Sequence, residues 1–188
     1  MEHKVRDEVL TTDESLLLLK IARESLQYYL KTGSHIEYDE SVLPDNLNLL
    51  HGVFVSLYKG NALRGCIGRL KPDLPLYKLV QRMTISAATG DNRFSSVKYG
   101  ELGQIRIEIS VLSELTKVSD PKQIELGKHG ILIRKDSFAG TFLPQVAIHT
   151  GWDLEEFLGH CSRDKAGIGW EGWKDAEIFI YTADVIRE

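Results

Sequence analysis

The sequence has few of the residues that build covalent or metal-held frameworks. It contains only two cysteines and five prolines among 188 residues. Two thiols provide neither a disulfide framework nor enough ligands for a structural cysteine-rich zinc site. No Pro-rich or Gly/Ser-rich tract interrupts the chain, so no linker is visible. We therefore expect a single domain over residues 1–188, with subdomain boundaries that the sequence leaves undefined.

Long apolar runs are also missing. No stretch approaches the ~20 apolar residues that a membrane-spanning helix needs. The charged start, residues 1–6, has no signal-peptide core. Apolar residues make up 43% of the chain and charged residues 27%, which is ordinary for a globular domain. The sequence therefore predicts a cytoplasmic protein that does not associate with a membrane.

The chain lacks an excess of basic charge and lacks cofactor motifs. Its formal net charge is −4, and its lysines and arginines are scattered, whereas nucleic-acid binding depends on clustered basic residues. Neither G-x-x-x-x-G-K-[ST] nor G-x-G-x-x-G occurs, and the histidines lack the H-x-x-x-H and H-x-x-E-H spacings. These absences disfavour nucleic acid as a partner, and we predict no cofactor and no metal site.

What is present is a set of grouped helix and strand patterns that predict an α+β fold. A capping box, with Glu14 three residues after Thr11, starts a strongly apolar first helix. Antiparallel hairpins argue against a parallel βαβ sheet. The expected helices lie at about 12–31, 76–89 and 153–164, and the expected strands at 53–58, 62–68, 105–112, 131–134, 141–143 and 178–185.

The second arm of the first hairpin carries an unusual pair of side chains. With a two-residue turn at Gly60-Asn61, Leu57 faces Arg64 and Val55 faces Cys66. Alternation then puts Arg64 and Cys66 on one face of the sheet. A nearby cation lowers the pKa of a thiol and raises its reactive fraction. The alternative is that Cys66 packs as a small hydrophobic residue among its apolar partners.

Two other features of the same region point to a site. Gly65 and Gly68 weaken the strand, which indicates that something approaches its backbone closely. In the strand at 105–112, Glu108 and Ser110 share one face. If this strand joins the same sheet, a carboxylate lies beside Arg64, either as an ion pair or as a proton-transfer group.

The second cysteine has a simpler interpretation. His160 and Cys161 are adjacent on a predicted helix, where neighbouring side chains point about 100° apart and do not face each other. They therefore form no thiol–imidazole dyad. Because apolar residues surround this position in the sequence, we expect Cys161 to pack in a core.

Short motifs along most of the chain resemble the family named after the AMME-syndrome chromosomal region, the AMMECR domain family. Its prokaryotic members include AmmeMemoRadiSam system protein A. The chain departs from the family where Asn92, Ser95 and Ser96 replace frequent prolines, so the loop after Asp91 is expected to be less rigid. The matching segments are Gly52–Val55, Leu63–Gly68, Pro75-Leu76, Asp91–Phe94, Glu108–Ser113, Leu143–Ala147, Lys165–Gly167 and Trp173.

The resemblance implies the family's α+β fold, with mainly antiparallel sheets, packed helices, a main body and a smaller interwoven subdomain. It also implies that the matched residues form one site. There Cys66 is the candidate nucleophile, and Asp91 and Glu108 are the candidate acid/base groups. The candidate binding residues are Arg64, Gly65, Ile67, Gly68, Arg93, Phe94, Ser110 and Gln145.

Three functions stay open at this stage. Family members are encoded with, or fused to, Memo-like and radical-SAM proteins, which implies a shared modification system with a ligand or substrate cleft at Arg64–Gly68. The second function is a non-catalytic adaptor for a partner protein or peptide, with Cys66 structural and an exposed aromatic patch that includes Trp152, Trp170 or Trp173. The third, an RNA- or translation-associated regulator, is disfavoured by the acidic charge. The sequence decides neither whether the chain is an enzyme nor its oligomeric state.

Overall fold

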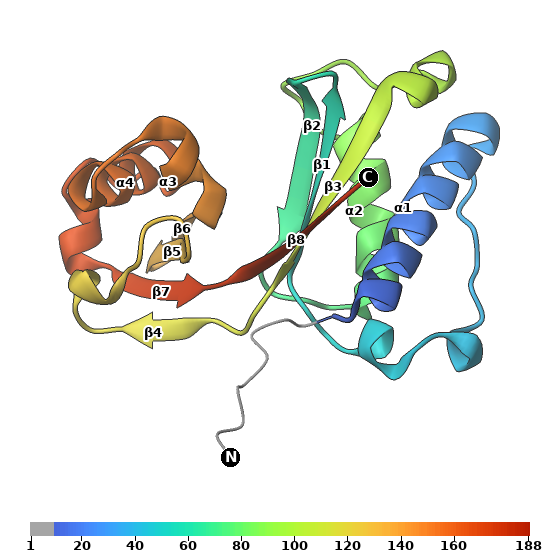
Figure 1. Ribbon diagram of the computed structural model, residues 1–188. Helices are drawn as coiled ribbons and strands as arrows, with labels where there is room; N and C mark the ends of the chain where they lie inside the picture. Colours follow the sequence, from blue (N-terminus) through green and yellow to red (C-terminus); the bar gives the residue numbers. More distant parts are fainter. Residues whose placement is uncertain (1–9) are drawn as a thin grey trace. The chain divides into compact units, whose positions relative to one another are not determined.

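The computed structural model describes residues 10–188, which divide into two compact units (Figure 1). Unit 1 runs up to Leu112 and includes residues 184–188, while unit 2 comprises residues 113–183. The chain thus leaves unit 1, builds unit 2 and returns to unit 1 for its last strand. This arrangement confirms the predicted α+β fold with a smaller interwoven part. The charged start at residues 1–6 lies outside the described residues.

Unit 1 combines two long helices with a four-stranded sheet in the order β2-β1-β3-β8. Strand β1 pairs antiparallel with both β2 and β3. The elements are α1 (Thr12–Thr32), the 3-10 helices η1 (Glu40–Val42) and η2 (Asp45–Asn48), β1 (Val53–Lys59), β2 (Ala62–Arg69), α2 (Leu76–Thr89), the 3-10 helix η3 (Tyr99–Gln104), β3 (Ile105–Leu112) and β8 (Ala183–Arg187).

The apolar face of this sheet packs against α1 and α2 to form the core of unit 1 (Figure 1). Alternation along each strand sends every second side chain to that face. The opposite face receives the residues in between, which include the polar positions of β3. The fully or nearly fully buried strand residues of this core are Val53, Val55, Leu57, Ile105, Ile107, Ile109 and Val111.

Helix α1 begins and ends where the sequence predicts. The Thr11 hydroxyl accepts a hydrogen bond from the backbone N of Glu14 (3.3 Å), and the Glu14 carboxylate accepts one from the backbone N of Thr11 (2.8 Å). At the other end, Gly33 has a φ of 75°, a left-handed conformation that glycine adopts at low cost. Local capping chemistry therefore fixes both ends of this helix.

The first hairpin has the predicted turn but not the predicted register. Tyr58 pairs with Leu63 and Leu57 pairs with Gly65, which leaves Arg64 as the extra residue of a β-bulge. Beyond the bulge, Cys66 pairs with Ser56 rather than with an apolar residue. The prediction that Val55 faces Cys66 is wrong because it assumed unbroken alternation. A glycine within a strand often marks a bulge, and Gly65 is that signal here.

Unit 2 contains a second four-stranded sheet, in the order β4-β7-β5-β6. Helices pack on this sheet around a separate core, in which Phe157 and Cys161 are fully buried. The elements are β4 (Thr116–Val118), the 3-10 helix η4 (Pro121–Gln123), β5 (Gly130–Lys135), β6 (Phe138–Phe142), α3 (Pro144–Thr150), α4 (Leu154–His160), a π-helical turn η5 (Cys161–Lys165), the 3-10 helix η6 (Gly172–Asp175) and β7 (Glu177–Tyr181).

Unit 2 differs from the sequence prediction in its short elements. Strand β4 has three residues and α3 has seven, and elements of that length carry too little periodicity to be recognised. The single strand expected at 178–185 is two strands, β7 and β8, separated at Thr182. No helix within residues 10–188 is long and apolar enough to cross a membrane.

Candidate functional site

The two glycines of β2 are approached closely by other parts of unit 1. A Cβ atom on Gly65 would lie 2.0 Å from the carbonyl oxygen of Ala87 on α2. A Cβ atom on Gly68 would lie 2.3 Å from the ring of Phe54 on β1. The close approach predicted from these glycines is therefore present, and it is made by the chain itself.

Four side chains form a polar row across the sheet on the face opposite the core. Cys66 on β2 and Glu108 on β3 both pair with Ser56 on β1, so they flank it. The Ser56 hydroxyl donates a hydrogen bond to Cys66 Sγ (3.2 Å). On β8, Arg187 Nε donates to Glu108 Oε2 (2.6 Å). We refer to Cys66, Ser56, Glu108 and Arg187 as the Cys66 row.

Most of the Cys66 row is shielded from solvent. Ser56 is 6% exposed and Glu108 is 7% exposed, while Cys66 is partly buried. Ser110, two residues further along β3, is also buried. Buried polar groups in native proteins are almost always hydrogen-bonded. Neighbours in the row supply partners for the Ser56 hydroxyl and the Glu108 carboxylate.

Burial raises the pKa of the Cys66 thiol above its ordinary value. The hydrogen bond from Ser56 and the charge of Arg93 act in the opposite direction without cancelling this effect, and the carboxylates of Asp91 and Glu108 raise the pKa further. At neutral pH Cys66 is therefore a protonated thiol. The prediction of a thiol pKa lowered by Arg64 is wrong, since Arg64 binds a different group.

Arg64, the extra residue of the bulge, binds the segment that precedes β3. Its Nε and Nη2 atoms donate to the Glu101 carboxylate (3.3 and 3.1 Å), and Nη1 donates to the carbonyl oxygen of Ser95 (2.6 Å). The ion pair lowers the pKa of Glu101 to about 2. Arg64 and Glu108 therefore each bind a different partner from the one considered in the sequence: Arg64 pairs with Glu101, and Glu108 pairs with Arg187.

Asp91 fastens the loop after α2 to the outer edge of the sheet. Its Oδ2 atom accepts a hydrogen bond from the backbone N of Cys66 (2.8 Å). The Arg93 side chain donates to both carboxylate oxygens, Nε to Oδ1 (2.9 Å) and Nη2 to Oδ2 (2.7 Å). These bonds, with Arg93 the largest cause, hold the pKa of Asp91 far below its usual range. Asp91 is thus ionised and fully engaged, which favours a positioning role.

Arg93 is a cation in direct contact with Cys66. Its Nη2 atom lies 3.4 Å from the Cys66 carbonyl oxygen, and its guanidinium lies over the ring of Phe94, 5.4 Å from the centroid. The Arg93 side chain is 51% exposed. Asp91 and Phe94 therefore fix an accessible guanidinium beside Cys66.

The predicted site residues belong to both units. Ile67 packs against the core of unit 1, and Gln145 lies in the first turn of α3 in unit 2. All the other predicted residues belong to unit 1, and within it Cys66, Asp91 and Arg93 are directly hydrogen-bonded to one another.

Sequence reasoning missed three residues of this region. Ser56 and Glu101 are local to it, and the bulge at Gly65 was the signal that would have found Ser56. Arg187 comes from the far end of the chain, and no local pattern announces its pairing with Glu108. Among residues 10–188, no group of three or more His, Cys, Asp or Glu side chains is arranged to hold a metal ion.

Cys161 packs as predicted. It is fully buried in the core of unit 2, and burial raises its thiol pKa to about 12. Its neighbour His160 stacks instead on Trp152, with ring centroids 3.9 Å apart, and binds Asp164. The two cysteines therefore differ in accessibility, and Cys66 is the more exposed one.

Comparison with known proteins agrees with this fold. The family model AMMECR1 matches residues 19–186. The chain belongs to the AMMECR1 family. It is 41% identical to protein MK0488 of Methanopyrus kandleri, covering 96% of this chain and 91% of that protein. With protein PF1979 of Pyrococcus furiosus the identity is 37%, covering 91% and 86%.

A solved structure shares the AMMECR1 architecture described above. The crystal structure of the uncharacterized protein PH0010 from Pyrococcus horikoshii superimposes with a TM-score of 0.90 at 33% identity, covering 96% of this chain and 94% of that one. The match of the AMMECR1 model extends over both units and includes every predicted site residue.

Proposed function

We propose that this AMMECR1-family protein binds a ligand at the Cys66 row and acts within a modification system, with Cys66 as nucleophile or thiol carrier. One observation carries the proposal: Cys66, Ser56 and Glu108 lie side by side on one sheet face. A thiol, a hydroxyl and a carboxylate in that order are the groups used in nucleophilic and acid/base chemistry.

Each residue of the row has a separate role in this proposal. Cys66 Sγ adds to an electrophilic carbonyl carbon of the ligand, and the electron pair of that C=O bond moves to its oxygen. Glu108 accepts the thiol proton, which the raised thiol pKa retains until that step. Ser56 holds Sγ in place through its 3.2 Å hydrogen bond. Arg187 fixes the orientation of the Glu108 carboxylate.

Arg93 supplies the binding group. It is half exposed and held rigidly by Asp91, so it is preorganised to bind an anion without losing further side-chain freedom. The ligand therefore carries a carboxylate or phosphate group next to its reactive carbon. Phe94 beneath the guanidinium adds an apolar contact.

The partners in this proposal come from the family resemblance. We expect a Memo-like protein and a radical-SAM protein to generate or consume the group that Cys66 carries. To test this, the purified chain is incubated with both proteins from the same genome and a small-molecule extract, and its intact mass is followed. A new mass on the wild type that is missing from Cys66→Ser supports the proposal. No added mass on the wild type, or the same added mass on both proteins, contradicts it.

A second function is favoured by the internal bonding of the same residues. Arg64 and Asp91 form hydrogen bonds with backbone groups of other segments of the chain, and burial keeps the Cys66 thiol protonated. These are properties of an adaptor in which Cys66 is structural. An adaptor keeps its partner affinity when Cys66 is changed to Ala, whereas a thiol carrier loses its function.

The three tryptophans expected in an adaptor patch all lie in unit 2 and are partly buried. Trp152 stacks on His160, and Trp170 makes an edge contact with the same imidazole. Trp152 and Trp173 pack against the core of unit 2.

A further inference from the structure

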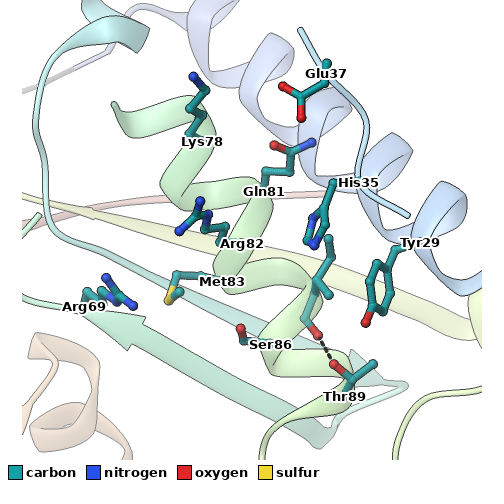
Figure 2. A pocket seen from close by; sticks show the side chains of 11 residues that line it. Tyr29, His35, Glu37, Arg69, Lys78, Gln81, Arg82, Met83, Ser86 and Thr89 are labelled. Carbon is teal, nitrogen blue, oxygen red and sulfur yellow. Dashed lines mark hydrogen bonds between the residues drawn. The ribbon is translucent and has the colours of Figure 1, made fainter. Parts of the chain in front are cut away.

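A hollow with a volume of about 510 Å³ lies in unit 1, along α2 (Figure 2). Lys78 and Arg82 come from successive turns of α2, which forms its floor. Figure 2 shows Arg69, from the end of β2, on one side of these residues and His35 and Tyr29 on the other. No residue of the Cys66 row lines this groove. A role for the groove therefore does not depend on the function proposed for the Cys66 row.

The lining of the groove is positively charged, whereas the chain as a whole is negatively charged. Three of its lining residues, Arg69, Lys78 and Arg82, carry a positive charge, and Glu37 is the one lining carboxylate. The chain itself has a net charge of −4. A concave surface lined by one sign of charge concentrates ligands of the opposite sign. The lining therefore favours anions.

Arg82 is the cation that lacks an internal partner. Arg69 pairs with Asp73, and Lys78 pairs with Glu40. Within residues 10–188, Arg82 makes no ion pair, and its side chain is exposed on the groove floor. Its guanidinium is therefore available for a bidentate contact with a phosphate or carboxylate.

The other side of the groove is aromatic. The rings of Tyr29 and His35 lie with centroids 5.3 Å apart, and both line the hollow. Aromatic side chains bind planar rings by offset or tilted stacking. A ligand that bridges the two sides thus needs a planar ring at one end and an anionic group at the other.

We infer that this groove is a binding site for a small molecule that combines a planar ring with a phosphate or carboxylate group. Its volume lies within the ~300–1,000 Å³ typical of small-molecule pockets. Arg82 binds the anionic group, Arg69 and Lys78 raise the local positive potential, and Tyr29 and His35 bind the ring.

The test uses three probes of graded chemistry on the full chain: inorganic phosphate, adenosine and adenosine 5′-monophosphate. Binding is followed by amide chemical shifts in 1H–15N NMR spectra, with titration to about 10 mM, since weak sites have Kd values near the millimolar range. We expect the monophosphate to bind most tightly and to shift amides of α2 and of residues 33–37.

Two variants test which residues bind the anionic group and the ring of the ligand, and a third variant serves as control. Arg82→Gln is expected to weaken monophosphate binding about tenfold, the loss of one charge-assisted contact, and to leave adenosine binding unchanged. His35→Ala is expected to weaken both adenosine and the monophosphate. Lys20→Gln, which removes an exposed charge from α1 outside the groove, is expected to change neither affinity.

Two results would overturn the inference. One is that no probe shifts the amides around the groove at the highest concentration. The other is that Arg82→Gln and Lys20→Gln bind the monophosphate with the same affinity, because the anion is then not held by the groove.

Discussion

Asp91 accepts hydrogen bonds from three groups of unit 1 through one carboxylate. It binds the backbone N of Cys66 at the edge of the sheet, the Arg93 side chain and the backbone N of Arg93. Because β2 is an edge strand, its outward amides need partners from outside the sheet. Asp91 supplies that partner at the position next to the thiol.

Replacing the Asp91 carboxylate tests how much it contributes to the stability of the fold. Asp91→Asn is expected to lower the free energy of unfolding by about 1–3 kcal/mol, since it removes the charge of a buried carboxylate that pairs with the half-exposed Arg93 and weakens the bond to Cys66. Urea unfolding measures the change. Asp39→Asn is the control, because Asp39 is an exposed cap of η1 whose hydrogen bonds an amide can replace. Equal losses in the two variants would contradict the account.

The same residue gives a pH dependence with a definite sign. The pKa of Asp91 is lowered in the folded state, so its stabilisation is present above the unfolded value of about 3.9 and is lost as the pH falls below it. The unfolding free energy of the wild type is therefore expected to fall more steeply in acid than that of Asp91→Asn. Parallel pH profiles would mean that Asp91 is not the source.

Gly65 tests the contact between β2 and α2. A methyl group there would lie 2.0 Å from the Ala87 carbonyl oxygen, so Gly65→Ala is expected to destabilise unit 1 by about 1–3 kcal/mol through overpacking. Gly100→Ala is the matched control, since nothing lies within 4 Å of a Cβ at that position. Thermal unfolding compares them. A Gly65→Ala variant as stable as the control would show that α2 can move away without cost.

At the scale of elements, the segment before β3 is attached to the sheet by Arg64. Its bonds to Glu101 and to the Ser95 carbonyl hold the segment against the bulge. Arg64→Met keeps much of the side-chain length and removes the charge. We expect faster hydrogen exchange of the amides of residues 95–104 and little change in α1, as measured by mass spectrometry. Unchanged exchange would mean that other contacts hold this segment.

The elements that the sequence predicts correctly are those whose ends are marked by local capping and turn residues. The capping box at Thr11 and the glycine at position 33 mark the ends of α1, and the turn at Gly60 marks the hairpin. The register of β2 is less well defined by the sequence. Gly65 signals a bulge, but which residue is left unpaired depends on how the strand packs against α2. The three-residue strand β4 carries too little pattern to be recognised.

The candidate site likewise contains residues that the sequence predicts and residues that it does not. Cys66, Asp91 and Arg93 are brought together by the loop that directly follows α2, so short motifs point to them. The partners of Arg64 and Glu108 are chosen by tertiary packing instead. Arg187 reaches Glu108 from 79 positions further along the chain, a separation that no local periodicity spans.

At the scale of the whole molecule, the chain enters unit 2 after β3 and returns through β8. The returning segment binds unit 1 at two points, through Arg187 with Glu108 and through Glu188 with Arg23. The backbone N of Glu188 also donates to the Ile107 carbonyl oxygen (3.2 Å). Unit 1 is therefore completed by residues that follow unit 2 in the chain.

Removing residues 184–188 tests this completion. The truncated chain is expected to lose the cover of the β3 edge and the partner of the buried Glu108 carboxylate, which costs about 3–5 kcal/mol when a buried pair loses one member. Limited proteolysis of unit 1 and urea unfolding measure the loss. Arg187→Gln separates the ion pair from the strand, and a truncated chain as stable as the full one would contradict the account.

The central claim is that Cys66 is an accessible thiol at a site and that Cys161 is a core residue. The most direct measurement is the alkylation rate of each cysteine in the native protein as a function of pH, resolved by mass spectrometry. We expect Cys66 alone to be labelled, slowly at neutral pH and faster only at a pH above that at which an ordinary thiol ionises, because burial raises its thiol pKa. A Cys66 that stays unlabelled until the protein is denatured would contradict it.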